Sequence, residues 1–70
     1  MTSYRAEAVD TWLRRRGWTL DRVRGSHHSY KHPAYRRTLG VVYHGREFPA
    51  WQMRNLFDDL RQISERENGE

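Results

Sequence analysis

The sequence predicts an α+β fold in which a helix, three short antiparallel strands and a second helix follow one another. Apolar residues recur at helical spacing near both ends of the chain, whereas apolar and polar residues alternate in the middle. Only two to five residues join the middle segments, and such short connections are typical of antiparallel strands. Both helices are expected on one face of the sheet, because an antiparallel sheet can leave its other face in water. The 70 residues make a single domain, with a core over about residues 4–63 and a flexible tail over 64–70.

The first helix is predicted over residues 4–16. Three apolar residues share one of its faces at helical spacing, namely Val9, Trp12 and Leu13. Thr2 or Ser3 is expected to cap its N-terminus, since short polar side chains accept hydrogen bonds from the first free N–H groups. Gly17 suits the left-handed position that ends a helix, and Trp18 can pack back on the last turn as in a Schellman motif.

The three strands are predicted over residues 18–24, 27–32 and 37–44. Gly25 and Ser26 form the turn between the first two strands, and Pro33 ends the second. The second strand is almost wholly polar, so one of its faces must be solvated, and Tyr30 is its expected buried residue. The third strand places three residues on one apolar face, namely Leu39, Val41 and Tyr43.

The second helix is predicted to begin near Pro49, since proline is favoured at the first position of a helix. Its apolar stripe consists of Met53, Leu56, Phe57, Leu60 and Ile63. Trp51 is out of phase with this stripe. It is therefore expected to be exposed, where it can stack on RNA or contact a partner protein.

The composition narrows the class of protein. The chain has no cysteine, which excludes disulfides and thiolate metal sites. It has no apolar run long enough to cross a membrane, and no apolar stretch behind its N-terminus that a signal peptide would need. These observations predict a cytoplasmic protein without a membrane partner.

Positive charge is concentrated in one part of the chain. The net charge is +4, but residues 11–46 carry nine cations against one acid, and twelve of all thirteen cations are arginines. The planar guanidinium group binds phosphates and stacks on bases, so this region is expected to bind nucleic acid. The alternative is an ordinary solvated surface that is rich in arginine.

One segment of the sequence matches a known motif. Residues 17–33 read Gly-Trp-x-Leu-x-Arg-Val-x-Gly-Ser-His-His-x-x-Lys-His-Pro, and this string closely resembles the core motif of the HicA family of bacterial toxins. Residues 41–47 and 53–57 resemble the third strand and the start of the last helix of that family. The resemblance thus runs from about Ala6 to Leu60.

HicA toxins are small mRNA interferases from toxin–antitoxin pairs. The resemblance therefore implies a metal-independent endoribonuclease that cleaves mRNA and is neutralised by a HicB-type antitoxin. It also implies an α-β-β-β-α fold similar to double-stranded-RNA-binding domains, in agreement with the order predicted above. No cofactor is expected, nor binding of DNA by the chain alone. The sequence departs from the family where Val42 or Tyr43 replaces a usual proline, and where the last helix runs beyond a usual glycine.

His27 is the residue that the resemblance implies is catalytic. It follows the turn at residues 25–26, and an imidazole can take the 2′-hydroxyl proton of RNA at neutral pH. His28 is the second choice, because adjacent strand residues point to opposite faces and a register shift of one residue would exchange the two. The residues expected to bind RNA are Gly25, Ser26, Arg22, Arg24, Lys31, Arg36, Arg37 and His44.

The histidines are not expected to form a metal site. Three of the four lie at positions 27, 28 and 32, but adjacent strand positions diverge and no carboxylate lies nearby in the sequence. In the favoured register, His28 is a partly buried histidine beneath a helix. His32 is likewise expected to be structural. His44 follows the third strand and can serve as a second proton donor or as an RNA contact.

Two other classes of function are compatible with the same residues. The basic face can belong to a non-catalytic nucleic-acid-binding module, or its arginines can contact an acidic partner protein. The histidine after the turn discriminates between the hypotheses, because binding alone does not require an imidazole at that position.

Overall fold

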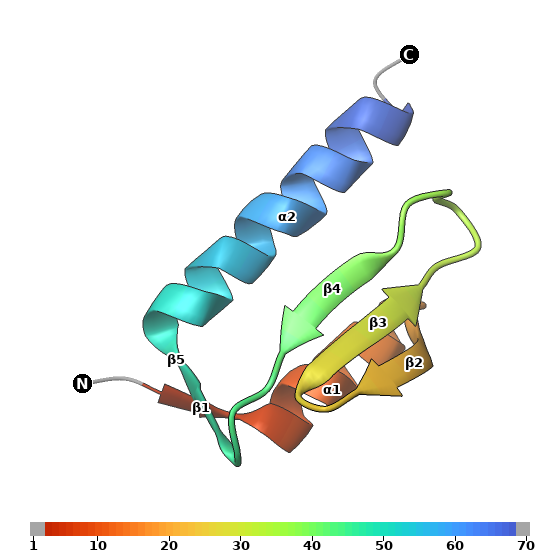
Figure 1. The fold of residues 1–70 in the computed structure, drawn as a ribbon. Helices are drawn as coiled ribbons and strands as arrows, with labels where there is room; N and C mark the ends of the chain where they lie inside the picture. The colour runs from red at the N-terminus through yellow and green to blue at the C-terminus, as the bar shows by residue number, and fades with distance from the viewer. Residues whose placement is uncertain (1–2, 69–70) are drawn as a thin grey trace.

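The computed structural model describes residues 3–68 of the chain. Its elements follow in the order β1 (Ser3–Arg5), α1 (Ala6–Arg15), β2 (Thr19–Arg24), β3 (His27–Lys31), β4 (Leu39–Val42), β5 (Glu47–Pro49) and α2 (Ala50–Asn68). Strands β2, β3 and β4 form an antiparallel sheet in that order, and β1 pairs with β5 in a separate two-stranded ribbon (Figure 1). The predicted α+β class and the order of the helices and the three central strands are confirmed. The ribbon is additional to the prediction.

The β1–β5 ribbon changes how the first helix begins. The hydroxyl of Ser3 donates a hydrogen bond to the Glu47 carboxylate, so Ser3 belongs to the ribbon and the prediction that it caps α1 is wrong. Thr2, the other predicted cap, lies outside the described residues. The helix starts two residues later than predicted, and its Ala6 N–H donates to the Arg46 carbonyl at 2.8 Å. A backbone carbonyl brought in by the ribbon thus replaces the side-chain cap.

The end of α1 forms the predicted Schellman motif. The Trp18 N–H donates to the Leu13 carbonyl, and the Gly17 N–H donates to the Arg14 carbonyl, each at 3.1 Å. Gly17 has a φ of 96°, a left-handed conformation that side chains other than glycine rarely adopt. A Cβ atom on Gly17 would also lie 2.6 Å from Nε2 of His32, so the close approach of these two segments of the chain requires glycine as well.

The register of the sheet decides which residues face the helices. Tyr30 lies opposite Leu39, and His28 lies opposite Val41, so these four residues share one face. Tyr30 is fully buried, as predicted, and His28 is half-buried. The β4 strand is shorter than the predicted 37–44, although Tyr43 beyond its end is still buried.

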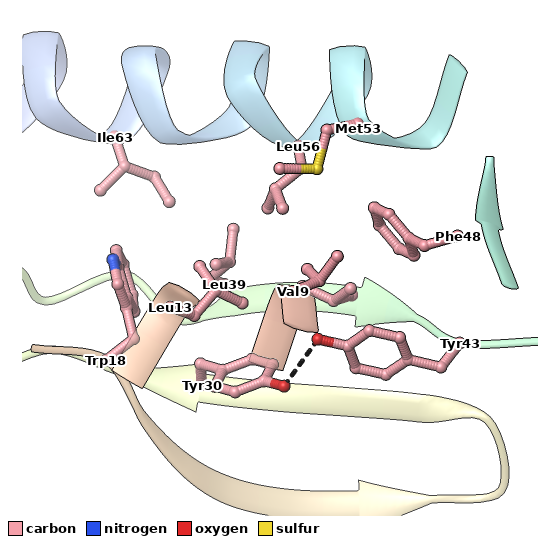
Figure 2. Packing of buried hydrophobic residues seen from close by; sticks show 11 residues of the cluster. Val9, Leu13, Trp18, Tyr30, Leu39, Tyr43, Phe48, Met53, Leu56 and Ile63 are labelled. Atoms are coloured by element: carbon pink, nitrogen blue, oxygen red, sulfur yellow. Dashed lines mark hydrogen bonds between the residues drawn. The ribbon is translucent and has the colours of Figure 1, made fainter. Parts of the chain in front are cut away.

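The core lies between this face of the sheet and both helices, which confirms that the helices share one face. Figure 2 shows α2 above the sheet, with side chains from α1, the sheet and α2 meeting between them. The buried residues are Val9, Leu13, Trp18, Tyr30, Leu39, Val41, Tyr43, Phe48, Met53, Leu56 and Ile63. Phe57 departs from the predicted stripe: its side chain is 49% exposed and contacts the edge of Trp12. Trp51 is 59% exposed, as predicted.

The C-terminal part of α2 covers residues 64–68 of the segment for which a flexible tail is predicted, while residues 69–70 lie outside the described residues. The helix continues to Asn68, and the Glu67 carboxylate accepts hydrogen bonds from the backbone N–H groups of Arg36, at 2.9 Å, and Arg37, at 3.2 Å. These bonds join the end of α2 to the loop between β3 and β4. The sequence gives no signal for this contact, because the groups that Glu67 binds are backbone N–H groups of a distant loop.

Candidate active site

The face of the sheet opposite the helices carries the predicted catalytic residue. Here β2 and β3 contribute side chains that point away from the core: His27, Ser29, Lys31, Arg22 and Arg24, which we term the open face. The pairing register places His27 between Arg24 and Val42, while Ser29 lies opposite Arg22. His27 and both arginines are exposed. An imidazole and two guanidinium groups therefore reach solvent side by side.

The Gly25–Ser26 turn precedes His27, as predicted. Gly25 has a φ of 61°, and nothing lies within 4 Å of the place that a Cβ would occupy. The turn is therefore open to solvent and its backbone is accessible to a phosphate. The structure thus brings four of the predicted RNA-binding residues together around His27, namely Arg22, Arg24, Gly25 and Ser26.

The other predicted RNA-binding residues lie away from His27. Lys31 ends β3, about 13 Å of strand from His27, and is 3.5 Å from the Asp21 carboxylate. Arg36 and Arg37 follow it in the loop that leads to β4, at the same distant end of the sheet. The sequence places all five cations in one cluster, whereas the sheet separates them into two groups, one beside His27 and one at the far end.

His44 also lies apart from the arginines of the open face. It forms an isolated bridge with Glu47 in the turn between β4 and β5. With the exposed Trp51, it lines a groove of about 300 Å³ between β4 and α2. His44 and Trp51 therefore line the same groove, to which neither β2 nor β3 contributes a residue.

His28 points to the opposite face from His27, in the favoured register. Its Nδ1 lies 3.3 Å from the Ser26 carbonyl, and its ring meets Tyr43 edge to face at 4.7 Å. It lines an open pocket of about 550 Å³ beneath α1, together with Asp10 and Arg14. The structure thus puts one of the two adjacent histidines in solvent and the other against the core.

Within residues 3–68, no three His, Asp or Glu side chains lie close enough together to hold a metal ion. The same range contains no helix that is both long and apolar enough to span a membrane.

A comparison with protein families supplies the identification. The model of the "HicA toxin of bacterial toxin-antitoxin" family matches residues 6–64, which is most of the chain. The chain belongs to the HicA family. Membership of a toxin–antitoxin family implies an antitoxin partner. No curated protein and no solved structure gives a match, so the likeness to double-stranded-RNA-binding domains stays a prediction.

Several residues of the HicA motif serve the fold. His32 accepts a hydrogen bond at Nδ1 from the Ala34 N–H, at 3.0 Å, and Nδ1 therefore carries no proton. The proton is on Nε2, which donates to the Arg16 carbonyl at 2.9 Å. The ring also meets Trp18 edge to face at 5.1 Å. His32 thus holds the end of α1 and the loop after β3 together, which confirms the structural role predicted for it.

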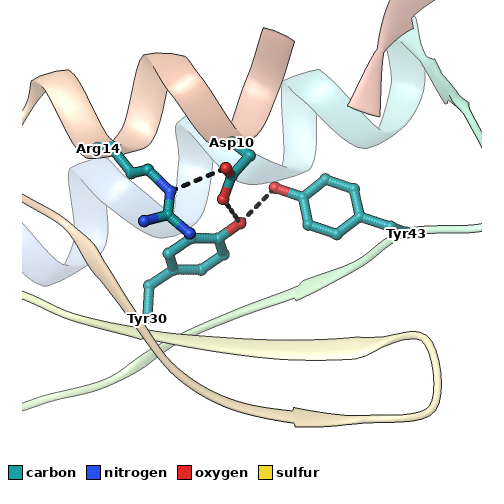
Figure 3. Close-up of polar contacts among 4 residues, drawn as sticks. All are labelled: Asp10, Arg14, Tyr30 and Tyr43. Atoms are coloured by element: carbon teal, nitrogen blue, oxygen red, sulfur yellow. Dashed lines mark hydrogen bonds and ion pairs between the residues drawn. The ribbon is translucent and has the colours of Figure 1, made fainter. Parts of the chain in front are cut away.

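Between the sheet and α1 of this HicA protein, two tyrosines and an ion pair form a network that the sequence does not predict (Figure 3). The Tyr30 hydroxyl donates to the Asp10 carboxylate at 2.7 Å, and Asp10 also binds Nε of Arg14 at 2.8 Å. The Tyr30 and Tyr43 oxygens are 2.8 Å apart. Because the proton of Tyr30 is directed to Asp10, Tyr43 must donate to Tyr30. The i, i+4 spacing of Asp10 and Arg14 is the one part of this network that was readable from the sequence.

Burial raises the pKa of Tyr30, and its hydrogen bonds to Tyr43 and Asp10 raise it further. Burial also raises the pKa of Tyr43 above the ordinary value of a tyrosine. Both hydroxyls therefore keep their protons in the folded protein at a pH at which the unfolded chain loses them.

This difference predicts a loss of stability in alkali. Above pH 10.0, the ordinary tyrosine pKa, the folded state binds more protons than the unfolded state. The free energy of unfolding is therefore expected to fall as the pH rises beyond this value, by at most about 1.4 kcal/mol per pH unit for each tyrosine that keeps its proton. Urea unfolding between pH 8 and pH 11 measures this slope. Tyr43→Phe should make this slope less steep, and an unchanged slope in that variant would contradict the assignment.

Proposed function

We propose that this HicA-family protein is a toxin that acts as a metal-independent endoribonuclease on mRNA, with His27 as its catalytic residue. The observation that carries the proposal is the placement of His27 on the open face. Its imidazole is exposed, Arg24 lies opposite it on β2, and Gly25–Ser26 directly precedes it. The resemblance to HicA toxins assigns the catalytic histidine to the same position.

The chemistry needs only groups that this face supplies. His27 takes the proton of a ribose 2′-hydroxyl, and the 2′-oxygen forms a bond to the adjacent phosphorus. The bond from phosphorus to the 5′-oxygen breaks, and this leaving oxygen takes a proton from the imidazolium or from water. Arg22 and Arg24 stabilise the negative charge that develops on the phosphate, since a guanidinium group pairs with two phosphate oxygens at once.

The test is cleavage of RNA beside DNA of the same sequence, with a chelator present. We expect purified protein to cleave the RNA and to leave the DNA intact, because DNA has no 2′-hydroxyl. An RNA with one 2′-deoxy nucleotide should resist cleavage at that nucleotide alone. Cleavage of both polymers, or cleavage that requires an added divalent metal ion, would overturn the proposal.

The second candidate is binding of RNA without cleavage. The observation that favours it is the composition of the open face. Among the described residues, His27 is the one imidazole on this face, so no second imidazole is present there to protonate the leaving 5′-oxygen. A charged sheet surface can bind RNA through its phosphates alone. Retention of RNA without any cleavage in the same assay would favour this function over the first.

The partner is proposed to be a HicB-type antitoxin that covers the open face. An antitoxin with acidic residues would associate rapidly with the arginines there. It would also raise the stability of the toxin by mass action, which matters for a domain of this size. We expect the antitoxin from the neighbouring gene to bind the protein and to stop RNA cleavage. Binding that leaves the cleavage rate unchanged would exclude coverage of this face.

The separation of the cations predicts that the two arginine pairs contribute unequally to RNA binding. The double variant Arg22→Glu/Arg24→Glu should weaken binding strongly and lower the slope of log affinity against log salt by about two, because each phosphate contact contributes about one. The matched control is Arg36→Glu/Arg37→Glu, which changes the net charge equally at the far end of the sheet. Titrations with RNA at several salt concentrations compare the affinities of the two double variants. Equal effects would show that net charge, rather than the open face, determines binding.

A further inference from the structure

We propose that His28 is a positioning residue that fixes the peptide group from which His27 extends, an inference that rests on the proposed catalytic role of His27. His28 itself would not touch the substrate. It would act from the buried side of the sheet on a backbone carbonyl, that of Ser26.

The Ser26 carbonyl receives two hydrogen bonds. The Tyr43 N–H donates to it at 2.9 Å, and Nδ1 of His28 lies 3.3 Å from it. A carbonyl oxygen can only accept, so Nδ1 of His28 must carry a proton in this contact. The Ser26 carbonyl and the His27 N–H belong to one planar peptide group. Two donors on that oxygen therefore set the orientation of the plane to which the His27 Cα is attached.

The turn is closed by the Arg24–His27 strand pair, and its own two residues lie outside the strands. Gly25 is exposed and nothing lies within 4 Å of its Cβ position. Ser26 precedes the first residue of β3, so the strand pairing begins only at His27. Beyond the Arg24–His27 strand pair, the contacts on the Ser26 carbonyl join this turn to the backbone of Tyr43 and to the His28 side chain.

The His28 ring is held by the tyrosine network. Tyr43 meets the ring edge to face with an interplanar angle of 89°, and the Tyr43 hydroxyl donates a hydrogen bond to the Tyr30 hydroxyl. Tyr30 is fully buried, and its hydroxyl donates a hydrogen bond to the carboxylate of Asp10 in α1. A continuous series of contacts therefore runs from the first helix to the peptide group before His27. Such support matters because a misplacement of about 1 Å at a reacting group can cost a factor of about 100 in rate.

Two substitutions separate this role from direct catalysis. The side-chain nitrogen of asparagine can occupy the place of histidine Nδ1, whereas that of glutamine occupies the place of Nε2. We expect His28→Asn to keep kcat within about threefold of the parent, because it can still donate to the Ser26 carbonyl. His28→Gln should lose about tenfold in kcat with an unchanged KM, and both variants should keep the parental pH profile.

A second measurement reports the geometry without substrate. The NMR scalar coupling between the amide and α protons of His27 depends on its φ angle. It should change in His28→Gln and stay at the parental value in His28→Asn. The matched control is His32→Gln, at the other end of β3, which should lower the melting temperature but leave this coupling and the kcat of the folded protein unchanged.

The outcomes distinguish the two proposals. If folded His28→Asn and His28→Gln both lose 100-fold or more, His28 is itself catalytic and the positioning role is overturned. If both cleave like the parent, or if the coupling of His27 is the same in all variants, the role is likewise overturned. If the parent does not cleave RNA at all, the proposed function fails, while the coupling still decides whether His28 orients His27.

Discussion

Replacing His27 with alanine is expected to lower the rate of RNA cleavage by about 100-fold or more. A positioned general base contributes roughly 10²–10⁴ to a rate, and alanine cannot accept the proton. RNA affinity should persist, since Arg22 and Arg24 remain on the open face. Stability should change by only about 0.5 kcal/mol, because the side chain is exposed. Cleavage, RNA binding and thermal unfolding of the same preparation measure the three properties.

The matched control is His27→Gln, which keeps a polar side chain that cannot act as a base near neutral pH. It should be as inactive as His27→Ala. Parental cleavage by both variants would show that the imidazole is not catalytic. If they lose cleavage together with folding, the loss would reflect structure, and the exposed position assigned to His27 would be wrong.

Replacing Gly17 with alanine is expected to lower the free energy of unfolding by roughly 2–3 kcal/mol. The φ of 96° costs a residue with a Cβ about 1–2 kcal/mol. The Cβ would also lie 2.6 Å from Nε2 of His32, and moving that ring breaks its hydrogen bond to the Arg16 carbonyl, worth about 1 kcal/mol. The sum is a large part of the total free energy of unfolding, which is roughly 5 kcal/mol for a domain of this size. Urea unfolding curves measure it.

Substitutions at two other glycines separate the cost of the left-handed φ from the cost of the close contact with His32. Gly45 has a φ of 70° but nothing within 4 Å of its Cβ position, so Gly45→Ala should show the conformational cost alone. Gly40 has neither constraint and lies in β4, so Gly40→Ala should change stability by less than about 0.5 kcal/mol. If Gly17→Ala were no more destabilising than Gly45→Ala, the close contact with His32 would be unimportant.

The sequence by itself determined the elements whose apolar pattern is local. Val9 and Leu13 repeat at helical spacing, and Leu39 and Val41 alternate along a strand, so the helix and the strand follow from the period of burial. The Schellman motif at Gly17 was equally predictable, because its requirement for a left-handed residue is met within a few positions. The same alternation separated His27 from His28, since neighbouring strand residues point to opposite faces.

The tertiary structure alone decided the features that join distant residues. A strand of three residues has too short a pattern to predict, and β1 exists only because β5 lies beside it. Glu67 binds backbone groups some thirty positions away, and Asp10 meets Tyr30 across the core, so neither pairing leaves a local signal. The arginines form one cluster in sequence but two groups in space, because the length of β3 separates them. Local periodicity fixes the elements, whereas the partners of polar groups depend on which elements the hydrophobic core brings together.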